Sequence, residues 1–161
     1  MTDLTKTLLA LLCAAPLAAC NSGKEEEEDP LAHACEVITD AGTAVTAGAD
    51  IASAPGIQIG EVPYTVTLID GAAGFVSVNV SEDTPAILFM GTADVAQTLY
   101  QDGTDVGLPE GAPDDLCAED VPEHFDLDLH TAGTWTIELG PAAITEVWLL
   151  LHEAGEHVHE E

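Results

Sequence analysis

The stretch that decides the fold is 124–140, which reads HFDLDLHTAGTWTIELG. In its first half, Phe125, Leu127 and Leu129 alternate with polar residues, and a second alternating run follows Gly133. A period of two is the pattern of a strand that has one buried and one solvated face. We therefore predict two neighbouring strands that are joined as a hairpin by the short link containing Gly133.

Short runs of the same kind recur along the chain between Gly, Pro and Asp residues, and no stretch shows a sustained period of 3.6. The run 86–90 is apolar on both faces and is expected to be central, and a turn is expected at 101–103. The fold class that follows is all-β, a single antiparallel β-sandwich or jelly roll of about eight strands. The expected strands are 43–49, 64–69, 75–80, 86–90, 95–100, 124–130, 134–139 and 145–152.

The alternation across 63–80, then 86–90, then 124–140 resembles that of bacterial pre-peptidase C-terminal domains. In that family the later strands alternate polar with apolar residues, pass through Ala-Gly-Thr-aromatic-Thr and end in an apolar strand. The resemblance covers roughly residues 60–152. It implies a small jelly-roll module that accompanies secreted enzymes as a non-catalytic binding or targeting unit, although a shared fold does not establish a shared function.

An export signal opens the chain. Its apolar run, 8–17, is too short to cross a bilayer, which needs about twenty residues. The sequence LAAC at 17–20 closes it and resembles the lipobox of bacterial lipoproteins. The resemblance implies that the signal peptide 1–19 is removed and that Cys20 becomes an N-terminus carrying acyl chains such as palmitate. The alternative is an ordinary cleaved signal with an incidental cysteine.

The residues after the lipobox indicate where the protein is held. Asn21 is not the aspartate that commonly retains lipoproteins in the inner membrane, so the family resemblance implies an outer-membrane location in the cell envelope. Residues 20–30 carry four consecutive glutamates and nothing apolar to bury, which predicts a flexible acidic linker. A cation site formed by these glutamates is the alternative. The β-sandwich domain is then 31–152, and 153–161 is a His/Glu-rich tail.

Charge excludes some partners. The chain has 30 acidic residues against two basic ones, for a net charge of −28, and has no arginine. A protein that follows nucleic-acid phosphates needs several Lys or Arg contacts, so nucleic acid is excluded as a partner. Electrostatic docking to anionic lipid is disfavoured for the same reason, which leaves the lipid anchor to hold the membrane. The acidity suits divalent cations or a basic protein partner, or it serves solubility or a salty habitat.

This interpretation assigns a role to each of the four cysteines. Cys13 leaves with the signal and Cys20 takes lipid, so Cys35 and Cys117 remain as a pair in an oxidising compartment. A disulfide between them is expected to stabilise the domain by roughly 4–5 kcal/mol, because it closes a long loop. A metal-binding or redox-active pair is the alternative.

The C-terminal segment 152–161 is the strongest chemical candidate, since it combines His152, His157 and His159 with glutamates. Imidazole and carboxylate ligands suit Zn²⁺ or Cu²⁺, and Ni²⁺ as well. The zinc-protease motif does not fit, because His152 and His157 are five residues apart and Gly155 lies between them. The alternative is a frayed polar terminus without a ligand. No cofactor is required by this interpretation.

A second group of candidate ligands lies on the expected strand 124–130. His124, Asp126, Asp128 and His130 share one face of it, opposite the apolar residues. This face is either a solvated surface or a ladder of metal ligands. His33 could join either histidine group in space, and the sequence does not place it.

Enzyme motifs are missing from the sequence: it has no Gly-x-Ser-x-Gly elbow, phosphate loop or dinucleotide fingerprint. The acidic loops 102–105 and 114–115 do not match a calcium-binding loop and are expected to be ordinary turns. We therefore expect a non-enzymatic, lipid-anchored binding or interaction module with weak metal binding by its tail. A dedicated periplasmic divalent-metal lipoprotein is the first alternative, and an enzyme built from scattered acids is the second.

Overall fold

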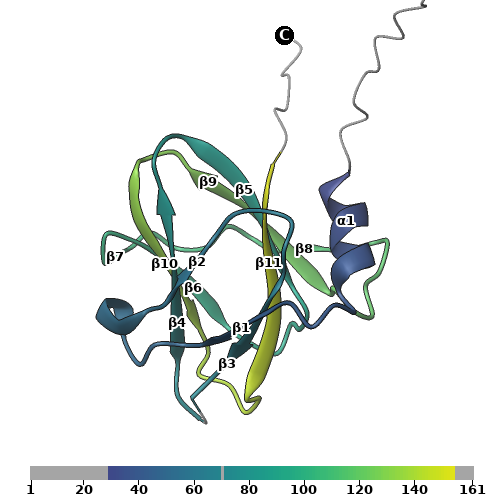
Figure 1. Cartoon of the computed structure of the whole chain (residues 1–161), viewed down its shortest axis with the longest axis horizontal. Coiled ribbons are helices and arrows are strands. Elements are labelled where there is room, and N and C mark those ends of the chain that lie inside the picture. Colours follow the sequence, from purple (N-terminus) through teal and green to yellow (C-terminus); the bar gives the residue numbers. More distant parts are fainter. Residues whose placement is uncertain (1–28, 70, 155–161) are drawn as a thin grey trace, which may run out of the picture.

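Two facing β-sheets make up the molecule, seen in a computed structural model that describes residues 29–69 and 71–154 (Figure 1). The six-stranded sheet contains β1 (Thr43–Thr46), β3 (Tyr64–Thr67), β5 (Thr84–Met90), β8 (Ala112–Pro113), β9 (Glu123–Leu129) and β11 (Glu146–Glu153). The five-stranded sheet contains β2 (Gly56–Ile57), β4 (Gly74–Val80), β6 (Gln97–Gln101), β7 (Thr104–Asp105) and β10 (Gly133–Leu139). The strand orders are β1-β3-β11-β5-β9-β8 and β2-β4-β10-β6-β7.

The predicted all-β sandwich is confirmed, but the sheets are mixed rather than purely antiparallel. β1 pairs with β3 and β2 pairs with β4, each in parallel. The chain alternates between the sheets here, so more than a dozen residues separate the two members of each pair. A connection of that length allows a parallel crossover. The two-residue strands β2, β7 and β8 were not predicted, because two residues are too few to show an alternating pattern.

The predicted hairpin at Gly133 is wrong. β9 pairs with β5 and β8 in the six-stranded sheet, whereas β10 pairs with β4 and β6 in the other sheet. The short link therefore carries the chain across the sandwich. The indole N–H of Trp135 donates to the carbonyl of Thr131 in this link, at 3.0 Å, while its ring is buried. Local alternation predicts the strands but does not specify the sheet that each one joins.

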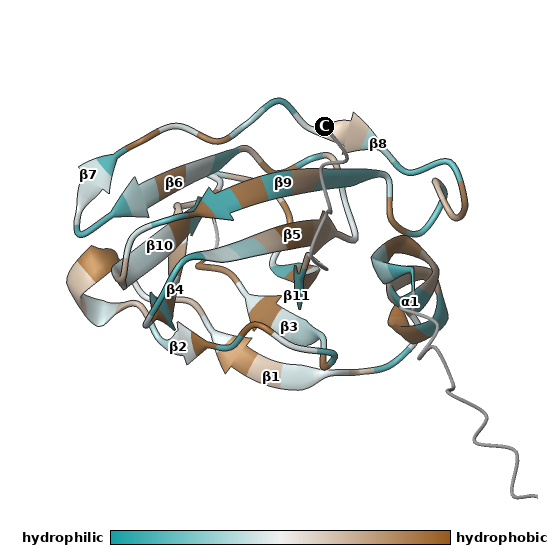
Figure 2. Ribbon diagram, turned by 90° about the horizontal axis from the view of Figure 1, so that it is seen from above, coloured by the Kyte–Doolittle hydropathy of each residue, from teal (hydrophilic) through white to brown (hydrophobic). Residues whose placement is uncertain are grey.

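The main core lies between the sheets, and alternation places its residues there. Phe125, Leu127 and Leu129 of β9 point into it as predicted, and Figure 2 shows the matching alternation of colour along this strand. β5 is central in its sheet, with β11 and β9 on either side, and it contributes Ala86, Leu88 and Met90. The largest fully buried side chains that the other sheet contributes to the main core are Trp135, Ile137 and Leu139.

The predicted turn at 101–103 is confirmed. Asp102 and Gly103 connect β6 to β7 with φ values of 47° and 80°. Two successive positive φ values are characteristic of the tight hairpin turn whose twist matches that of the flanking strands. Asp102 also accepts the N–H of Thr134 through its side chain at 3.1 Å, which joins the turn to β10.

A short helix, α1 (Pro30–Val37), replaces the strand-only domain start that the sequence predicted. Asp29 caps it by accepting the N–H of Leu31 at 3.0 Å, and Pro30 occupies a first-turn position, where its missing N–H costs nothing. A single turn of 3₁₀ helix, η1 (Ile51–Ser53), connects β1 to β2. Within 29–69 and 71–154, no helix has the length and apolar character needed to cross a membrane.

α1 lies beside β11, outside the sandwich, as Figures 1 and 2 both show. There it covers the outer face of the six-stranded sheet and forms a second apolar cluster, which we call the helix core. Its buried members are Ala34, Phe89, Val121 and Leu150. β5 therefore serves both cores, because Leu88 points to one and Phe89 to the other.

Candidate functional site

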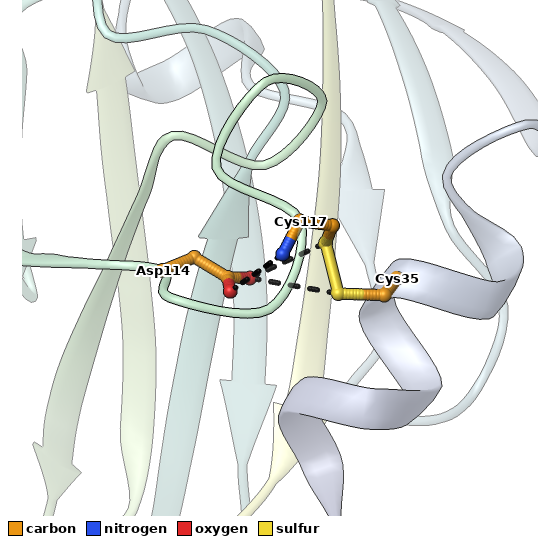
Figure 3. Close-up of side chains that lie close together, drawn as sticks. All are labelled: Cys35, Asp114 and Cys117. Atoms are coloured by element: carbon orange, nitrogen blue, oxygen red, sulfur yellow. Dashed lines mark hydrogen bonds between the residues drawn. A yellow bond between two sulfur atoms is a disulfide. The ribbon is translucent and has the colours of Figure 1, made fainter.

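The disulfide between Cys35 and Cys117 joins α1 to the loop 114–121 (Figure 3). Its presence confirms the pairing that the sequence predicted for the two cysteines. Cys117 packs against the helix core, and Val121 of the same loop is one of the four buried members. The disulfide therefore closes the helix core covalently at its outer side.

Asp114 lies against this disulfide and is only 1% exposed. Its Oδ1 accepts the backbone N–H groups of Leu116 at 2.7 Å and Cys117 at 3.1 Å. Its Oδ2 lies 3.4 Å from Sγ of Cys117 and 3.8 Å from Sγ of Cys35. Dashed lines mark these contacts in Figure 3. A disulfide sulfur carries no hydrogen, so these approaches are contacts in the oxidised state. They would become S–H···O hydrogen bonds if the pair were reduced.

The ligand atoms of Asp114 and the two cysteines are spaced like those of a metal site. In the part of the chain that the structure describes, they are the one group of three His, Cys, Asp or Glu residues whose ligand atoms lie close enough to hold an ion, all within 4.8 Å. Thiolates, not disulfides, bind metals. Because both sulfurs are in the disulfide and the carboxylate holds the loop backbone, this group is a structural joint.

His33 and His152 come together although they are far apart in sequence. Their ring centroids are 5.4 Å apart at an interplanar angle of 57°. Nε2 of His33 is 3.0 Å from the carbonyl oxygen of Glu61, and Nδ1 of His152 is 2.7 Å from that of Glu153. Both rings are half-buried. The docking of α1 beside β11 brings this pair together.

A hollow of about 410 Å³ opens beside this pair. It is formed where the loop before β3 meets the end of β11, and the N–H of Gly60 donates to the carbonyl of Leu151 at 2.8 Å. The hollow is lined by Gly60, Glu61, Val62, His152 and Glu153. Two glutamates and an imidazole thus share one concave surface.

His124 and His130 do not come together. They lie six residues apart on one face at the two ends of the β9 segment, which separates them by about 20 Å at the usual rise of a strand. His124 is half-buried, 5.8 Å from the ring of Phe89, and its Nδ1 is buried without a hydrogen-bond partner among the described residues. His130 is exposed and packs edge-on against Trp135 at 6.1 Å. The outward position of Asp126 and Asp128 agrees with the predicted solvated face.

The acidic turns have local roles. Asp102 accepts the N–H of Thr134, and Asp105 accepts that of Gly107 at 2.8 Å. Asp50 accepts the N–H and the hydroxyl of Ser53, and these bonds lower the pKa of its carboxyl below the usual value. Each of these carboxylates thus stabilises a turn or a helix start.

Tyr100 is paired with Glu138 on the outer face of the five-stranded sheet. Its hydroxyl donates to the carboxylate at 2.5 Å, and this bond, together with the negative charge of Glu138, raises the pKa of the phenol. The carboxylate stabilises the protonated phenol, so Tyr100 is not activated as a nucleophile.

Several predicted site residues lie outside the described residues: Cys20 and the tail histidines His157 and His159. The contributions of His33 and Asp114 were not assigned from the sequence. The position of His33 could have been predicted from Asp29-Pro30, because a capping residue followed by proline marks the start of a helix. That start places His33 in the first turns of α1. The sequence does not mark Asp114 in this way, because a chain with so many acidic residues does not show which of them is buried.

The similarities found to known proteins lie among solved structures. No family model matches the chain, and no curated protein matches it. Among solved structures, it is similar to the crystal structure of a pre-peptidase C-terminal domain of a collagenase from Bacillus anthracis, with 11% sequence identity and a TM-score of 0.43. The match covers 63% of this chain and 94% of that one. It says nothing about what either protein binds.

Proposed function

We propose that this chain is a non-enzymatic binding or interaction module of the bacterial cell envelope, held on the outer membrane by lipid on Cys20. The sequence LAAC at 17–20 supports the anchor, and the acidic segment 20–30 supports a spacer between bilayer and domain. Several acyl chains bind a membrane far more firmly than one, since each buried methylene adds about 0.8 kcal/mol. The domain then works in the periplasm or at the cell surface.

The observation that carries the proposal is the attachment of α1. This helix follows the proposed spacer directly, and Cys35–Cys117 bonds it covalently to a loop of the sandwich. Without the disulfide, a force on the tether would be resisted mainly by the packing of the helix core, which has four buried members. The disulfide instead passes that force to the loop 114–121, which Asp114 secures from inside. This arrangement suits a domain that is held at its N-terminal end.

Four of the described acidic groups are committed to structural hydrogen bonds, which supports a binding role over catalysis for them. Asp50, Asp102 and Asp114 hold backbone N–H groups. Glu138 accepts the hydroxyl of Tyr100. Groups committed to such bonds are poor candidates for proton transfer, which needs an acid or base directed at a substrate. The net charge of −28 suits cations or a basic protein as the partner.

Transition-metal binding is the second candidate function, in which the protein is a dedicated divalent-metal lipoprotein. The tail 153–161, with His157 and His159, supplies the proposed ligands, and Zn²⁺ or Cu²⁺ is the proposed ion. The specific observation that favours it is the proximity of His152, just before the tail, to His33.

The anchor is tested by Cys20→Ser with Cys13→Ser as the matched control, since both cysteines lie in the proposed export segment. The wild type and Cys13→Ser should sediment with membranes and incorporate labelled palmitate. Cys20→Ser should do neither, because the acyl acceptor is gone. Labelling and membrane retention of Cys20→Ser would contradict the proposal.

A further inference from the structure

We infer that the outer edge of β1 is a docking site for an extended segment of a basic protein, which adds to the six-stranded sheet as a further strand. The inference rests on the proposed binding function, and it names the surface and the chemical class of the partner. Three observations support it: the direction of the backbone groups of β1, the absence of charge along this edge, and the net charge of the chain.

Alternate residues of β1 bond to β3. The N–H groups of Thr43 and Ala47 donate to carbonyls in the segment 63–67, with N···O distances of 2.8 and 2.9 Å. In a parallel ladder, the residues between such positions direct their N–H and C=O groups to the opposite side. Those of Ala44 and Thr46 therefore point away from β3. β1 ends its sheet in the described part of the chain, so these groups form an open edge (Figure 2). An added strand bonds to groups of this kind.

The edge is held in place before any partner arrives. At one end, the hydroxyl of Thr65 donates to the carbonyl of Ala41 at 2.5 Å. At the other end, Gly48 exchanges two backbone hydrogen bonds with Phe75 of β4, at 2.9 and 3.0 Å. Val45 is half-buried and packs against the main core, which fixes the strand from inside. A rigid edge loses little conformational entropy when a strand is added to it.

The edge lacks the protection that exposed strands usually have. The segment 41–49 contains no charged residue and no proline, and three of the four residues of β1 are exposed. β8, at the other end of the same sheet, is two residues long and includes Pro113. It lies in the segment 110–123, which carries six acidic residues. Charges, prolines and short length keep sheet edges from pairing with other chains, so β8 is closed to an added strand and β1 is open.

Charge selects the partner. The chain carries a net charge of −28, so a second copy is repelled and a basic protein is attracted. Asp40 and Asp50 are exposed and flank the uncharged segment in the sequence. The exposed Glu146 pairs with Thr67, which in turn pairs with Thr46. Basic residues on either side of a short uncharged strand would therefore meet opposite charge, while the strand itself bonds to the backbone of β1.

The test is the binding of a fluorescent synthetic peptide to the full chain in detergent, measured by anisotropy. The peptide is a short run of alternating Thr and Val with two lysines at each end, and a matched peptide carries glutamates instead. The wild type should bind the lysine peptide and not the glutamate peptide. Thr46→Pro should weaken this binding about tenfold or more, because it removes an outward N–H without removing a bond to β3. Thr46→Ala keeps that N–H and is the control, with binding expected to equal that of the wild type.

Equal binding of the lysine peptide by Thr46→Pro and the wild type would overturn the inference. That outcome would leave the proposed interaction module standing, with its partner on another surface, and the lipid anchor is tested separately at Cys20. Absence of binding by the wild type would also overturn the inference. A wild-type dimer that is lost in Thr46→Pro, without peptide binding, would overturn it in favour of a second copy.

A second measurement does not depend on the folding of a variant. In the wild type, the amide NMR signals of Ala44 and Thr46 should shift when the lysine peptide is added. Their hydrogen exchange should slow, because an added strand takes up both N–H groups. The amide of Asp105 in β7, at an edge of the other sheet, should not change. Unchanged exchange at Ala44 and Thr46 would overturn the inference.

Discussion

The main core and the helix core are stabilised in different ways. Among the described residues the main core has 21 buried members, drawn from both sheets, whereas the helix core has four. Buried apolar area contributes about 25 cal/mol per Å², so the larger cluster can hold the sandwich by packing alone. The helix core is too small for that, and its covering helix is bonded to the loop 114–121 by a disulfide. A covalent link therefore substitutes for packing where the buried surface is small.

Removal of the disulfide should cause the largest loss of unfolding free energy and so test the difference between the two cores most directly. Cys35→Ser/Cys117→Ser releases a link across a sequence separation of 82, which the chain-entropy relation values at about 4–5 kcal/mol of unfolding free energy. Urea unfolding monitored by circular dichroism measures the loss. Cys20→Ser is the control, since it removes a cysteine outside the domain. An unchanged unfolding midpoint in the double variant would show that packing alone holds α1.

Truncation in the main core should have the next effect. Leu88→Ala removes a fully buried side chain of β5 and should lower the unfolding free energy by about 2–5 kcal/mol. Val62→Ala, at a position that is 58% exposed, is the control and should change it by less than about 0.5 kcal/mol. Because Leu88 faces the main core alone, its loss should add to that of the disulfide. Clear non-additivity would mean that the two cores unfold as one coupled unit.

The smallest expected effect is on pH dependence at η1, outside both cores. Bonds from Ser53 lower the pKa of Asp50 in the folded state, so its contribution to stability is fully present above the unfolded value of about 3.9. That contribution is lost as the pH falls through the folded pKa. Asp50→Asn keeps a capping amide but does not titrate. The stability difference between wild type and variant should therefore shrink in acid, and a difference that is constant with pH would refute this assignment.

Local alternation made much of the sandwich predictable. β9 was predicted from Phe125, Leu127 and Leu129, because side chains of a strand alternate between faces whatever its neighbours are. The same pattern could not predict which strands pair. β9 and β10 adjoin in sequence but belong to different sheets, and β1 joins β3 in parallel. Pairing depends on contacts between distant residues, and a single strand does not encode them.

The candidate site was only partly predictable for the same reason. Cys35 and Cys117 could be paired by elimination, since an oxidising compartment leaves few roles for two remaining thiols. His152 was singled out by its histidine-rich surroundings. His33 had no such neighbours, and its place beside His152 depends on how α1 docks on the sheet.

The sequence by itself determined the longer strands, their inward and outward faces, the cysteine pair and the acidic character of this protein. These properties follow from local periodicity and composition, which a chain carries before it folds. The tertiary structure alone decided the mixed sheets, the second core under α1 and the meeting of His33 with His152. They depend on packing between segments that are remote in sequence, where burial and the entropy of loop closure choose among arrangements that the local pattern leaves equivalent.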